Sequence, residues 1–490
     1  MLLYRWLKDT VKQKGGAKAL VYRDTYLSWR GLLHRVDRRA SEFKTIGVRP
    51  GDWVGLMLGN VPDFVILSLA LSKLRAAPLP LDPTTSTREL EMIMSVTPLR
   101  GLITRPRGGD APLPSATPAA GKKGAAKHKQ TPESRRRLQG TLLSCSIYPL
   151  EPAAQPKGDE AIVAILCTAD SAGDPKPVER TQANMAAEAD HVAHALGLTD
   201  EDRTLLTVPM FHSFGFDVGL AASLRVGAAV YLEDDVAPNR ILKLIREHKI
   251  TLFPGNATLF ESMARLPSAR PLTHKPVRLV SAGGGLVGSL ADGFQKKFGV
   301  RPLGCFHTTE TGTVSIDTKG QSGDTVGKPV EGVELRVTSP KTGKTAASGR
   351  KGVLWVRSAS VSRLELSAPL SIEGSVPVGG RDGEGWYRTG DIASVDRGGR
   401  LKLVGRDDDL VRVEGKRVAL GEVEGCIESF PKVSAAQARV ITDPLGGPMV
   451  VAKVVLKGKG KVDPEAIIDH CARNLSPYKV PRRIEFCKAL

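Results

Sequence analysis

The chain has 490 residues, of which 41% are hydrophobic and 25% are charged, a composition typical of a globular protein too long for one hydrophobic core. No apolar run approaches the ~20 residues that span a bilayer, which argues against a membrane span. The six cysteines are scattered without metal-binding spacing, so we expect reduced thiols in a cytoplasmic protein.

The net charge of +18 is concentrated in one segment. Residues 105–137 carry nine Lys or Arg and two Asp or Glu, which gives +7 and leaves +11 for the rest. The stretch 105–140 is rich in Pro, Ala and Gly, so we expect a basic, disordered surface insertion. It offers no aromatic side chain to stack on bases, and nucleic acid is not an expected partner. A basic surface also suits ATP, coenzyme A or an acidic carrier protein.

Apolar strands alternate with helical patterns along the first two thirds of the chain. Residues 52–58 predict a strand and residues 63–75 a helix with an apolar face. A second unit opens with 161–166, a fully apolar run typical of a buried parallel strand. It continues through strands near residues 204–208, 228–232, 251–253 and 277–281, separated by helical stretches. This alternation predicts a doubly wound α/β sheet with ligand loops at the carboxyl ends of the strands.

The pattern changes near residue 326 to short β segments and turns, as in a small β-barrel-like unit. A charged turn at 406–409 then precedes a compact α/β tail. The predicted fold is therefore α/β, with a large N-terminal domain (1–405) that contains two doubly wound α/β subdomains and a β-rich subdomain (326–405). A hinge and a small α/β C-terminal domain (410–490) follow it.

Three segments predict a nucleotide site. Residues 387–391 read Tyr-Arg-Thr-Gly-Asp, and Gly405 lies fourteen positions after Asp391 and opens Gly-Arg-Asp-Asp-Asp. The Asp391 carboxylate can accept both ribose hydroxyls, and the Arg406 guanidinium can hold ribose or phosphate. Upstream, the small-residue segment 168–176 resembles a phosphate loop whose backbone amides cradle phosphate oxygens. Together these segments indicate ATP chemistry.

With 209–215, 309–312 and 415–424, these motifs resemble the adenylate-forming superfamily of acyl-CoA synthetases, aryl-CoA ligases, adenylation domains and luciferases. The likeness is closest to acyl-CoA and acyl-carrier-protein synthetases. It implies that ATP activates a carboxylic acid to an acyl-adenylate, which is then transferred to the thiol of coenzyme A or of a carrier-protein phosphopantetheine. Fatty or aryl acids are the expected substrates, and magnesium the expected metal.

The resemblance implies a role for each motif residue. Glu310 and Thr168 would bind magnesium, and Lys176 and His212 would join Glu310 in catalysis. The remaining expected ATP-binding residues surround phosphate, adenine and ribose: Ser171, Gly173, Gly283, Gly284, Phe306, His307, Thr308, Thr309, Asp391 and Arg406.

The acid and the thiol would meet near the His212 gate. The expected acyl pocket contains Phe211, His212, Phe216 and Gly284. Asp408 is the expected hinge, and Gly415 would admit the pantetheine thiol, although a plain loop glycine explains it equally well. An amino-acid substrate would need an aspartate such as Asp217, but its neighbours predict a helix start, where aspartate caps amide groups.

Two departures from the family pattern leave a second hypothesis open. The phosphate loop has Ala169, Asp170, Ala172 and Pro177 where hydroxyl or glycine residues are usual. The chain ends before the family's catalytic lysine, and Lys488 lies too early to replace it, which implies a truncated domain or a natural loss. The first hypothesis is an acid–thiol ligase, and the second is a degenerate member that binds a nucleotide or an acyl group as a scaffold.

Overall fold

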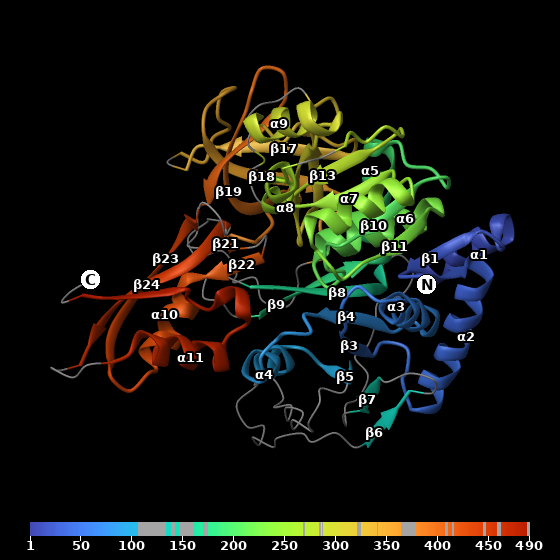
Figure 1. Cartoon of the computed structure of the whole chain (residues 1–490), viewed down its shortest axis with the longest axis horizontal. Helices are drawn as coiled ribbons and strands as arrows, with labels where there is room; N and C mark the ends of the chain where they lie inside the picture. The colour runs from blue at the N-terminus through green and yellow to red at the C-terminus, as the bar shows by residue number, and fades with distance from the viewer. Residues whose placement is uncertain are drawn as a thin grey trace.

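The fold of the protein is given by a computed structural model. It describes residues 1–105, 134–138, 143–147, 160–169, 175–267, 270–283, 286, 288–320, 325–340, 342–363, 378–406, 410–413, 416–443, 447–457 and 462–487. Figure 1 shows a large domain and, beside it, a small domain formed by the C-terminal part of the chain. The predicted α/β class with a large and a small domain is confirmed.

The largest sheet has nine strands in the order β16-β15-β14-β13-β12-β10-β11-β1-β2. Its central strands run parallel, as the sequence predicts for β10 to β13. The N-terminal hairpin joins this sheet because β1 pairs with β11, so the two subdomains are not consecutive in the chain. The strands are β1 (Lys18–Tyr22), β2 (Thr25–Ser28), β10 (Arg203–Leu206), β11 (Ala229–Leu232), β12 (Leu252–Gly255), β13 (Arg278–Ser281), β14 (Leu303–Thr308), β15 (Gly312–Ile316) and β16 (Lys328–Pro329).

The second sheet has five strands in the order β4-β3-β5-β7-β6. They are β3 (Trp53–Met57), β4 (Ala77–Leu81), β5 (Leu99–Thr104), β6 (Ser134–Arg137) and β7 (Ser144–Ile147). The prediction of a disordered insertion over 105–140 is wrong for residues 134–137, which form β6 and pair with β7. Composition does not identify such a strand, because sheet edges tolerate charged residues. Residues 106–133 and 139–140 lie outside the described part of the chain.

The apolar run at 161–166 lies in a separate two-stranded ribbon. β8 (Ile162–Ala169) pairs with β9 (Pro175–Thr181) in antiparallel register, and the ribbon runs between the two larger sheets in Figure 1. The run is buried, as predicted, but the expectation of a parallel strand is wrong. An apolar run indicates that both faces of a strand are buried. It does not indicate whether the partner strand is parallel or antiparallel.

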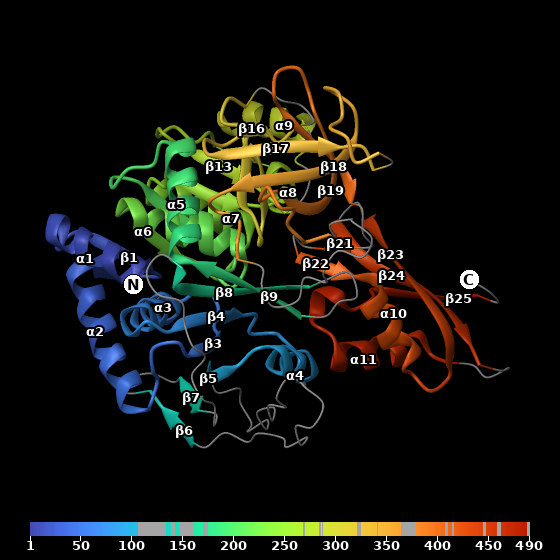
Figure 2. The same ribbon diagram turned by 180° about the vertical axis from the view of Figure 1, so that it is seen from behind.

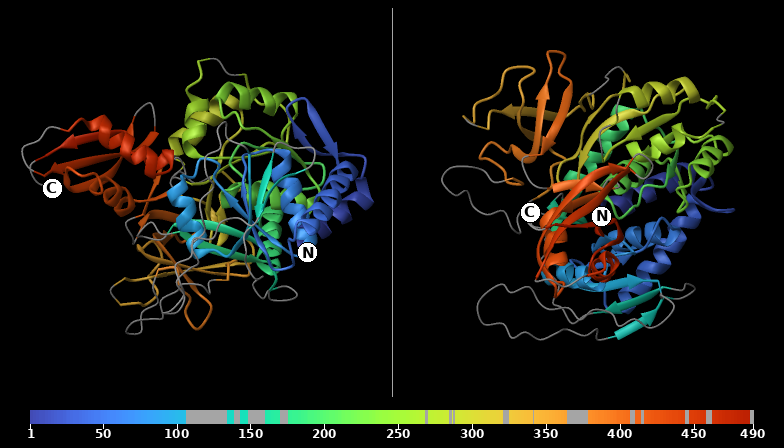
Figure 3. Two further views of the ribbon diagram at one scale, coloured as in Figure 1. Left: turned by 90° about the horizontal axis from the view of Figure 1, so that it is seen from below. Right: turned by 60° about the vertical axis from the view of Figure 1, so that its left-hand side comes forward.

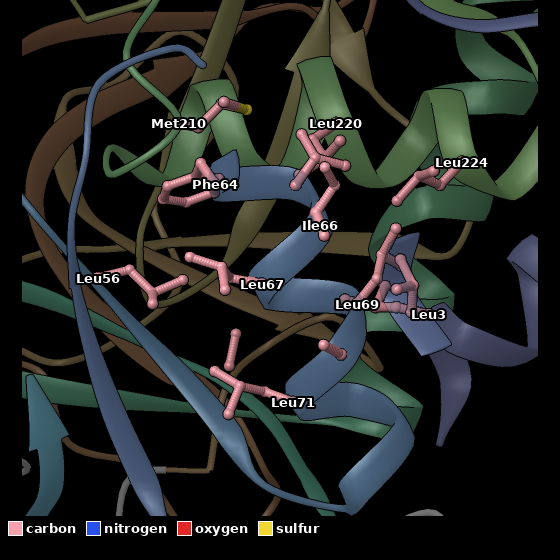
Figure 4. Close-up of a cluster of buried hydrophobic side chains, with 14 of the residues drawn as sticks. Leu3, Leu56, Phe64, Ile66, Leu67, Leu69, Leu71, Met210, Leu220 and Leu224 are labelled. Carbon is pink, nitrogen blue, oxygen red and sulfur yellow. The ribbon is translucent and has the colours of Figure 1, made fainter. Parts of the chain in front are cut away.

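Helix α3 (Pro62–Leu74) confirms the helix predicted at 63–75 and lies in the core of the large domain. Its residues Phe64 to Ser72 are all buried, and a helix that is apolar all round belongs inside a core. Figure 4 shows α3 side chains beside Leu56, Met210, Leu220, Leu224 and Leu3.

The other helices of the large domain are α1 (Leu2–Lys14), α2 (Trp29–Thr45), α4 (Thr87–Val96), α5 (Gln182–Leu196), α6 (Ala222–Val226), α7 (Pro238–Glu247), α8 (Ala257–Ala264) and α9 (Gly288–Phe298). A π-helix, η2 (Gly215–Ala221), precedes α6 and lies directly on β10. A Cβ at Gly219 would stand 2.3 Å from the Leu206 side chain, so a larger residue here would require Leu206 to move. None of the described helices is long and apolar enough to cross a membrane.

The β-rich subdomain is an open four-stranded antiparallel sheet in the order β17-β18-β19-β20. Its strands are β17 (Val333–Thr338), β18 (Gly352–Ser358), β19 (Tyr387–Val395) and β20 (Leu401–Arg406). The barrel-like expectation is wrong in this detail, because β17 and β20 do not pair within the described residues. Closing a barrel around packed side chains takes about eight strands.

The small domain packs a three-stranded sheet, β23-β24-β25, against two helices. Its elements are β21 (Leu410–Val413), β22 (Lys416–Ala419), α10 (Leu420–Glu428), β23 (Val433–Asp443), β24 (Gly447–Leu456), α11 (Pro464–Asn474), η3 (Pro477–Lys479) and β25 (Arg483–Phe486). Figure 2 and Figure 3 show this domain projecting from one side of the large domain. The β21–β22 hairpin lies inward, where β22 packs against β8, and α11 packs against α4.

Candidate active site

A cavity of about 170 Å³ lies where the small domain meets the large one. The large domain contributes the end of β8, residues of the 209–215 motif, which we call the gate segment, and the end of β14. The small domain contributes the start of β22, helix α10 and η3. Among the lining residues are Thr168, Phe211, His212, Ser213, His307, Thr308, Thr309, Lys416, Glu422, Ser476, Tyr478 and Lys479.

The turn between β14 and β15, residues 308–312, carries Thr309 and Glu310. Inside this turn the Thr311 amide donates to the Thr308 hydroxyl at 3.1 Å, and the two threonine hydroxyls lie 2.9 Å apart. The Thr309 hydroxyl lies 3.0 Å from the Ser213 hydroxyl, which connects the turn to the gate segment. Thr309 lines the cavity, whereas Glu310 is buried and does not.

The gate segment places two of the predicted acyl-pocket residues at the cavity. The Phe214 amide donates to His212 Nδ1 at 3.2 Å, so a neutral His212 carries its proton on Nε2. The Lys416 ammonium lies 5.2 Å from the centre of the Phe211 ring. Phe216 does not line this cavity. It is fully buried and packs edge-on against Phe64, because its place in η2 turns its ring towards α3.

Asp391 and Arg406, from the two motifs that predict a ribose site, stand opposite each other on β19 and β20. Arg406 Nη1 donates to Asp391 Oδ1 at 3.1 Å, and both side chains are largely buried. Neither residue lines the cavity, so the convergence of Glu310, Asp391 and Arg406 on one nucleotide stays a prediction.

The remaining predicted residues fall into three groups. Thr168 lines the cavity at the end of β8, directly opposite Lys176 in the β8–β9 register. Lys176, Gly283 and Phe306 are described but do not line the cavity. Outside the described part of the chain lie Ser171, Gly173, Gly284, Asp408 and Gly415.

Asp217 does not cap a helix, so the local interpretation of this residue is wrong. It is fully buried in η2, neither carboxylate oxygen accepts a hydrogen bond from the described residues, and the nearest cation is Arg180, 3.5 Å away. Burial raises the pKa of Asp217 to about 7, with Arg180 opposing this effect and Glu188 adding to it. The sequence pattern gave no signal for Arg180 or Glu188.

A second group of residues that sequence reasoning missed joins the two domains. Lys479 donates to Glu89 at 2.7 Å and to Glu422 at 2.8 Å, and the Ser476 hydroxyl donates to Glu89 at 2.6 Å. We call Glu89, Glu422, Ser476 and Lys479 the interdomain cluster. Next to it, Lys416 Nζ lies 2.5 Å from an oxygen of Asp82.

The interdomain cluster shifts the pKa of its members in different directions. Burial opposes the charge of Lys479, but Tyr478 and the two glutamates raise the lysine pKa. Burial also opposes ionisation of Glu89, yet the Lys479 ammonium and the Ser476 hydrogen bond outweigh it and lower the pKa of Glu89. For Glu422, burial outweighs Lys479 and raises the pKa. Glu89 is therefore the carboxylate on which the ion pair with Lys479 chiefly depends.

Known proteins match the chain along its length. Residues 7–364 match the family described as AMP-binding enzyme, and residues 422–490 match the AMP-binding enzyme C-terminal domain. The oxalate–CoA ligase of Arabidopsis thaliana is 26% identical, over 98% of this chain and 93% of the relative. A feruloyl-CoA synthase of Amycolatopsis sp is 25% identical, over 99% of this chain and 95% of the relative.

A solved structure has the same fold. It is a double mutant of o-succinylbenzoate CoA synthetase from Bacillus subtilis, bound with a product analogue. Its TM-score is 0.81 at 22% identity, and the match covers 99% of this chain and 95% of that one. The arrangement of a large and a small α/β domain is therefore shared with a structure of known activity.

Proposed function

The chain belongs to the family of AMP-binding enzymes, and from this premise we propose which acid and which thiol its cavity serves. The chain is an acid–thiol ligase: it activates a carboxylic acid with ATP and then forms a thioester. The observation that carries the assignment to this cavity is that both domains line it, with Thr168 and Thr309 on one side and Lys416 on the other.

The acid is a fatty or aryl acid and not an amino acid. The resemblance implies that an ammonium group would need an aspartate near residues 209–217, and Asp217 is the one that the sequence has there. The acidic residues that line the cavity, Asp82, Glu89 and Glu422, are already paired with Lys416 and Lys479. Asp217 is fully buried and already faces Arg180, so it is unable to hold a substrate cation in the cavity. The side chains of Leu81, Ile93 and Phe211 supply apolar surface instead.

The acceptor thiol is that of coenzyme A. Strand β22 packs against β8, and Lys416 at its start lines the cavity from the small domain. Gly415, the position expected to admit the thiol, precedes Lys416 in the chain and lies outside the described residues. We assign this domain arrangement to the thiol-transfer step. Coenzyme A is a polyanion, and a chain with a net charge of +18 attracts polyanions. A carrier protein is the alternative acceptor, and a cytoplasmic location remains a prediction supported by the six free cysteines.

The residues present fit a magnesium–ATP complex. Glu310 is a buried carboxylate and Thr168 a hydroxyl, and magnesium prefers such oxygen ligands. When bound, the ion would neutralise phosphate charge, which the attacking carboxylate would otherwise oppose. Thr309 and Lys176 would donate to phosphate oxygens, Asp391 and Arg406 would bind ribose, and His212 would separate the acid from the nucleotide. The small domain would exclude water from the cavity.

Pyrophosphate exchange with a panel of acids tests this proposal. The full-length protein is incubated with ATP, magnesium, labelled pyrophosphate and a fatty, an aryl or an amino acid. We expect exchange with fatty or aryl acids only, and acyl-CoA when coenzyme A is added. Exchange with amino acids would overturn the acid assignment, and product formed only on a carrier protein would overturn the acceptor. Nucleotide binding without exchange for any acid would favour the scaffold alternative, which the altered phosphate loop supports.

A further inference from the structure

Four ionisable side chains are enclosed beneath the candidate active site. Arg180 comes from β9, Glu188 from α5, Asp217 from η2 and His307 from β14. Arg180, Glu188 and Asp217 are completely buried, and His307 is 4% exposed. Charged side chains are rarely buried to this degree without partners, and no step of the proposed reaction uses Arg180, Asp217 or Glu188 directly. We call these four residues the turn network.

The turn network is a chain of contacts in which basic and acidic side chains alternate. Arg180 Nη2 lies 3.5 Å from Asp217 Oδ2. The two ring nitrogens of His307 each face one carboxylate, with Nε2 3.7 Å from Asp217 Oδ2 and Nδ1 3.7 Å from Glu188 Oε1. Arg180 contributes one positive charge, and the carboxylates of Asp217 and Glu188 contribute two negative charges. The turn network therefore has a net charge of −1 when His307 is neutral, and one additional proton brings it to zero. The order of side chains is then Arg180, Asp217, His307, Glu188.

One end of the turn network is attached to the turn at residues 308–312, and the other end to Thr313, the residue that follows it. At one end, Arg180 Nη1 donates to the Thr309 carbonyl oxygen at 3.0 Å. At the other end, the Glu188 carboxylate accepts from the Thr313 amide at 2.8 Å and from the Thr313 hydroxyl at 2.6 Å. The backbone segment that carries Glu310 is therefore held on both sides by one connected set of buried charges.

Gly312 confirms how closely the network approaches this backbone. The residue has φ +71°, a conformation that strains any residue with a Cβ, and a Cβ there would stand 2.1 Å from Glu188 Oε2. On the side of the β-rich subdomain, the Ser362 amide donates to the Glu310 carbonyl oxygen at 2.7 Å and the Ser360 hydroxyl to the Thr311 carbonyl oxygen at 2.8 Å. The turn thus has fixed contacts on both faces.

A bound metal ion explains the cluster less well. Ligand atoms of Glu188, Asp217 and His307 lie within 4.8 Å of one another, a spacing that would suit a cation. However, the Arg180 guanidinium already places positive charge against Asp217. In addition, Glu188 directs its oxygens at Thr313. We therefore assign no metal ion to this cluster, and the experiment below would detect one.

We propose that the turn network is a positioning device for magnesium–ATP: Arg180, supported by Asp217, His307 and Glu188, holds the Thr309–Glu310 backbone where it meets the nucleotide. This inference rests on the proposed function, because it takes Thr309 and Glu310 as the nucleotide contacts of an acid–thiol ligase. Arg180 acts through the Thr309 carbonyl and is not itself a catalytic residue. The network should affect the nucleotide more than the acid, because it holds Thr309 and Thr313 directly and reaches the gate segment through the contact between the Thr309 and Ser213 hydroxyls.

The test compares single and double variants of the full-length protein. Arg180→Met removes the donor to Thr309 and leaves Asp217 without its cation, so this variant should lose stability. In the double variant Arg180→Met/Asp217→Asn the unpaired charge is also removed, and thermal stability should largely recover. The contact to Thr309 remains absent, so the dissociation constant for magnesium with a non-hydrolysable ATP analogue should stay raised by about tenfold or more. The KM for the acid should change by less than about threefold.

The matched control is Arg225→Gln, which breaks a surface ion pair between α6 and α5, the helix that also carries Glu188. We expect it to leave both constants unchanged. A double variant that regains stability and also binds the ATP analogue like the wild type would overturn the proposal. So would a stoichiometric metal ion in the purified protein that is lost in Asp217→Asn.

Failure of the proposed function remains distinguishable, because calorimetric binding of the ATP analogue needs no turnover. A wild type that binds the analogue but exchanges no pyrophosphate would disprove the ligase and leave the positioning role of Arg180 open to the same comparison.

Discussion

The turn network and the interdomain cluster are built from the same kinds of side chain but differ in their surroundings. The turn network joins four elements of one domain, and no member is more than 4% exposed. The interdomain cluster joins α4 of the large domain to α10 and η3 of the small domain, with side chains 9–12% exposed in its ion pairs. One set lies within a single domain, with only His307 at the wall of the cavity, and the other lies at the boundary between the two domains.

This difference decides what happens when an ion pair is broken. Asp217 can regain water only if the large domain unfolds, because every element around it belongs to that domain. Glu89 and Glu422 regain water as soon as the small domain moves away. Similar buried charges should therefore control folding stability in the first case and domain arrangement in the second.

The largest effect is expected from Arg180→Met. Removing one partner of a buried ion pair costs about 3–5 kcal/mol, because the remaining charge has lost both water and partner. We expect urea denaturation to show a loss of this size in the free energy of unfolding. A loss below about 1 kcal/mol, the value of an exposed ion pair, would contradict the description of Arg180 as sealed.

Lys479→Met should act on the second half-reaction. It leaves Glu89 and Glu422 facing each other without a cation, and the domains can separate to relieve this. We expect thioester formation from a preformed acyl-adenylate to fall by about tenfold or more, with little change in the urea midpoint of the large domain. Small-angle X-ray scattering should show an expanded particle. Equal losses in both half-reactions, without expansion, would argue against a role in domain arrangement.

The pH dependence of domain closure should follow Glu89. Because its pKa is lowered in the assembled protein, its contribution to closure is fully present above its usual value of 4.5 and is lost as the pH falls through the lowered pKa. Glu422, whose pKa is raised, partly opposes this contribution at neutral pH. We expect the wild type to expand in scattering experiments only below pH 4.5. The Glu89→Gln variant should already be expanded at neutral pH. If it expanded on acidification in the same way as the wild type, a group other than Glu89 would control domain closure.

The smallest effect is expected from Ser476→Ala. It removes one hydrogen bond to Glu89 and leaves the Lys479 ion pair in place. A hydrogen bond to a charged group contributes about 1.5–3 kcal/mol, and Glu89 keeps its ion pair with Lys479 in this variant, so we expect the low end of this range and a loss of thioester formation of about tenfold. A loss larger than that of Lys479→Met would show that the hydroxyl, and not the ammonium, carries the interdomain contact.

Sequence patterns predicted the features that depend on local periodicity or on a continuous motif. The strands β10 to β13 and helix α3 belong to this class. The hydrogen bond between Arg406 and Asp391 was not predicted, because the two motifs were interpreted only as separate ligands of one nucleotide. The direction of β8 was not predictable, since its apolar run is compatible with either partner direction.

The two charge clusters were missed for a different reason. Glu188 and Thr313 are 125 positions apart, and Glu89 and Lys479 are 390 apart, so no local window contains both partners. Glu89 also has a local role in the structure. Glu89 completes a capping box with Ser86, which the structure contains, and that alone accounts for its presence on α4. Asp217 resembled a helix cap in the same way, and there the local interpretation failed.

The π-helix η2 imposes a constraint on chain length. Its seven residues follow an i→i+5 hydrogen-bond pattern, and they carry Asp217 on one side and Gly219 against Leu206 on another. Deleting a single residue would convert the segment to ordinary α-helix and rotate everything on one side of the deletion by about 100°. Asp217 and Gly219 would then no longer meet Arg180 and Leu206 together. Insertions and deletions should therefore be far less tolerated at 215–221 than substitutions. A library of single-residue insertions, deletions and substitutions across this segment would test this difference in tolerance.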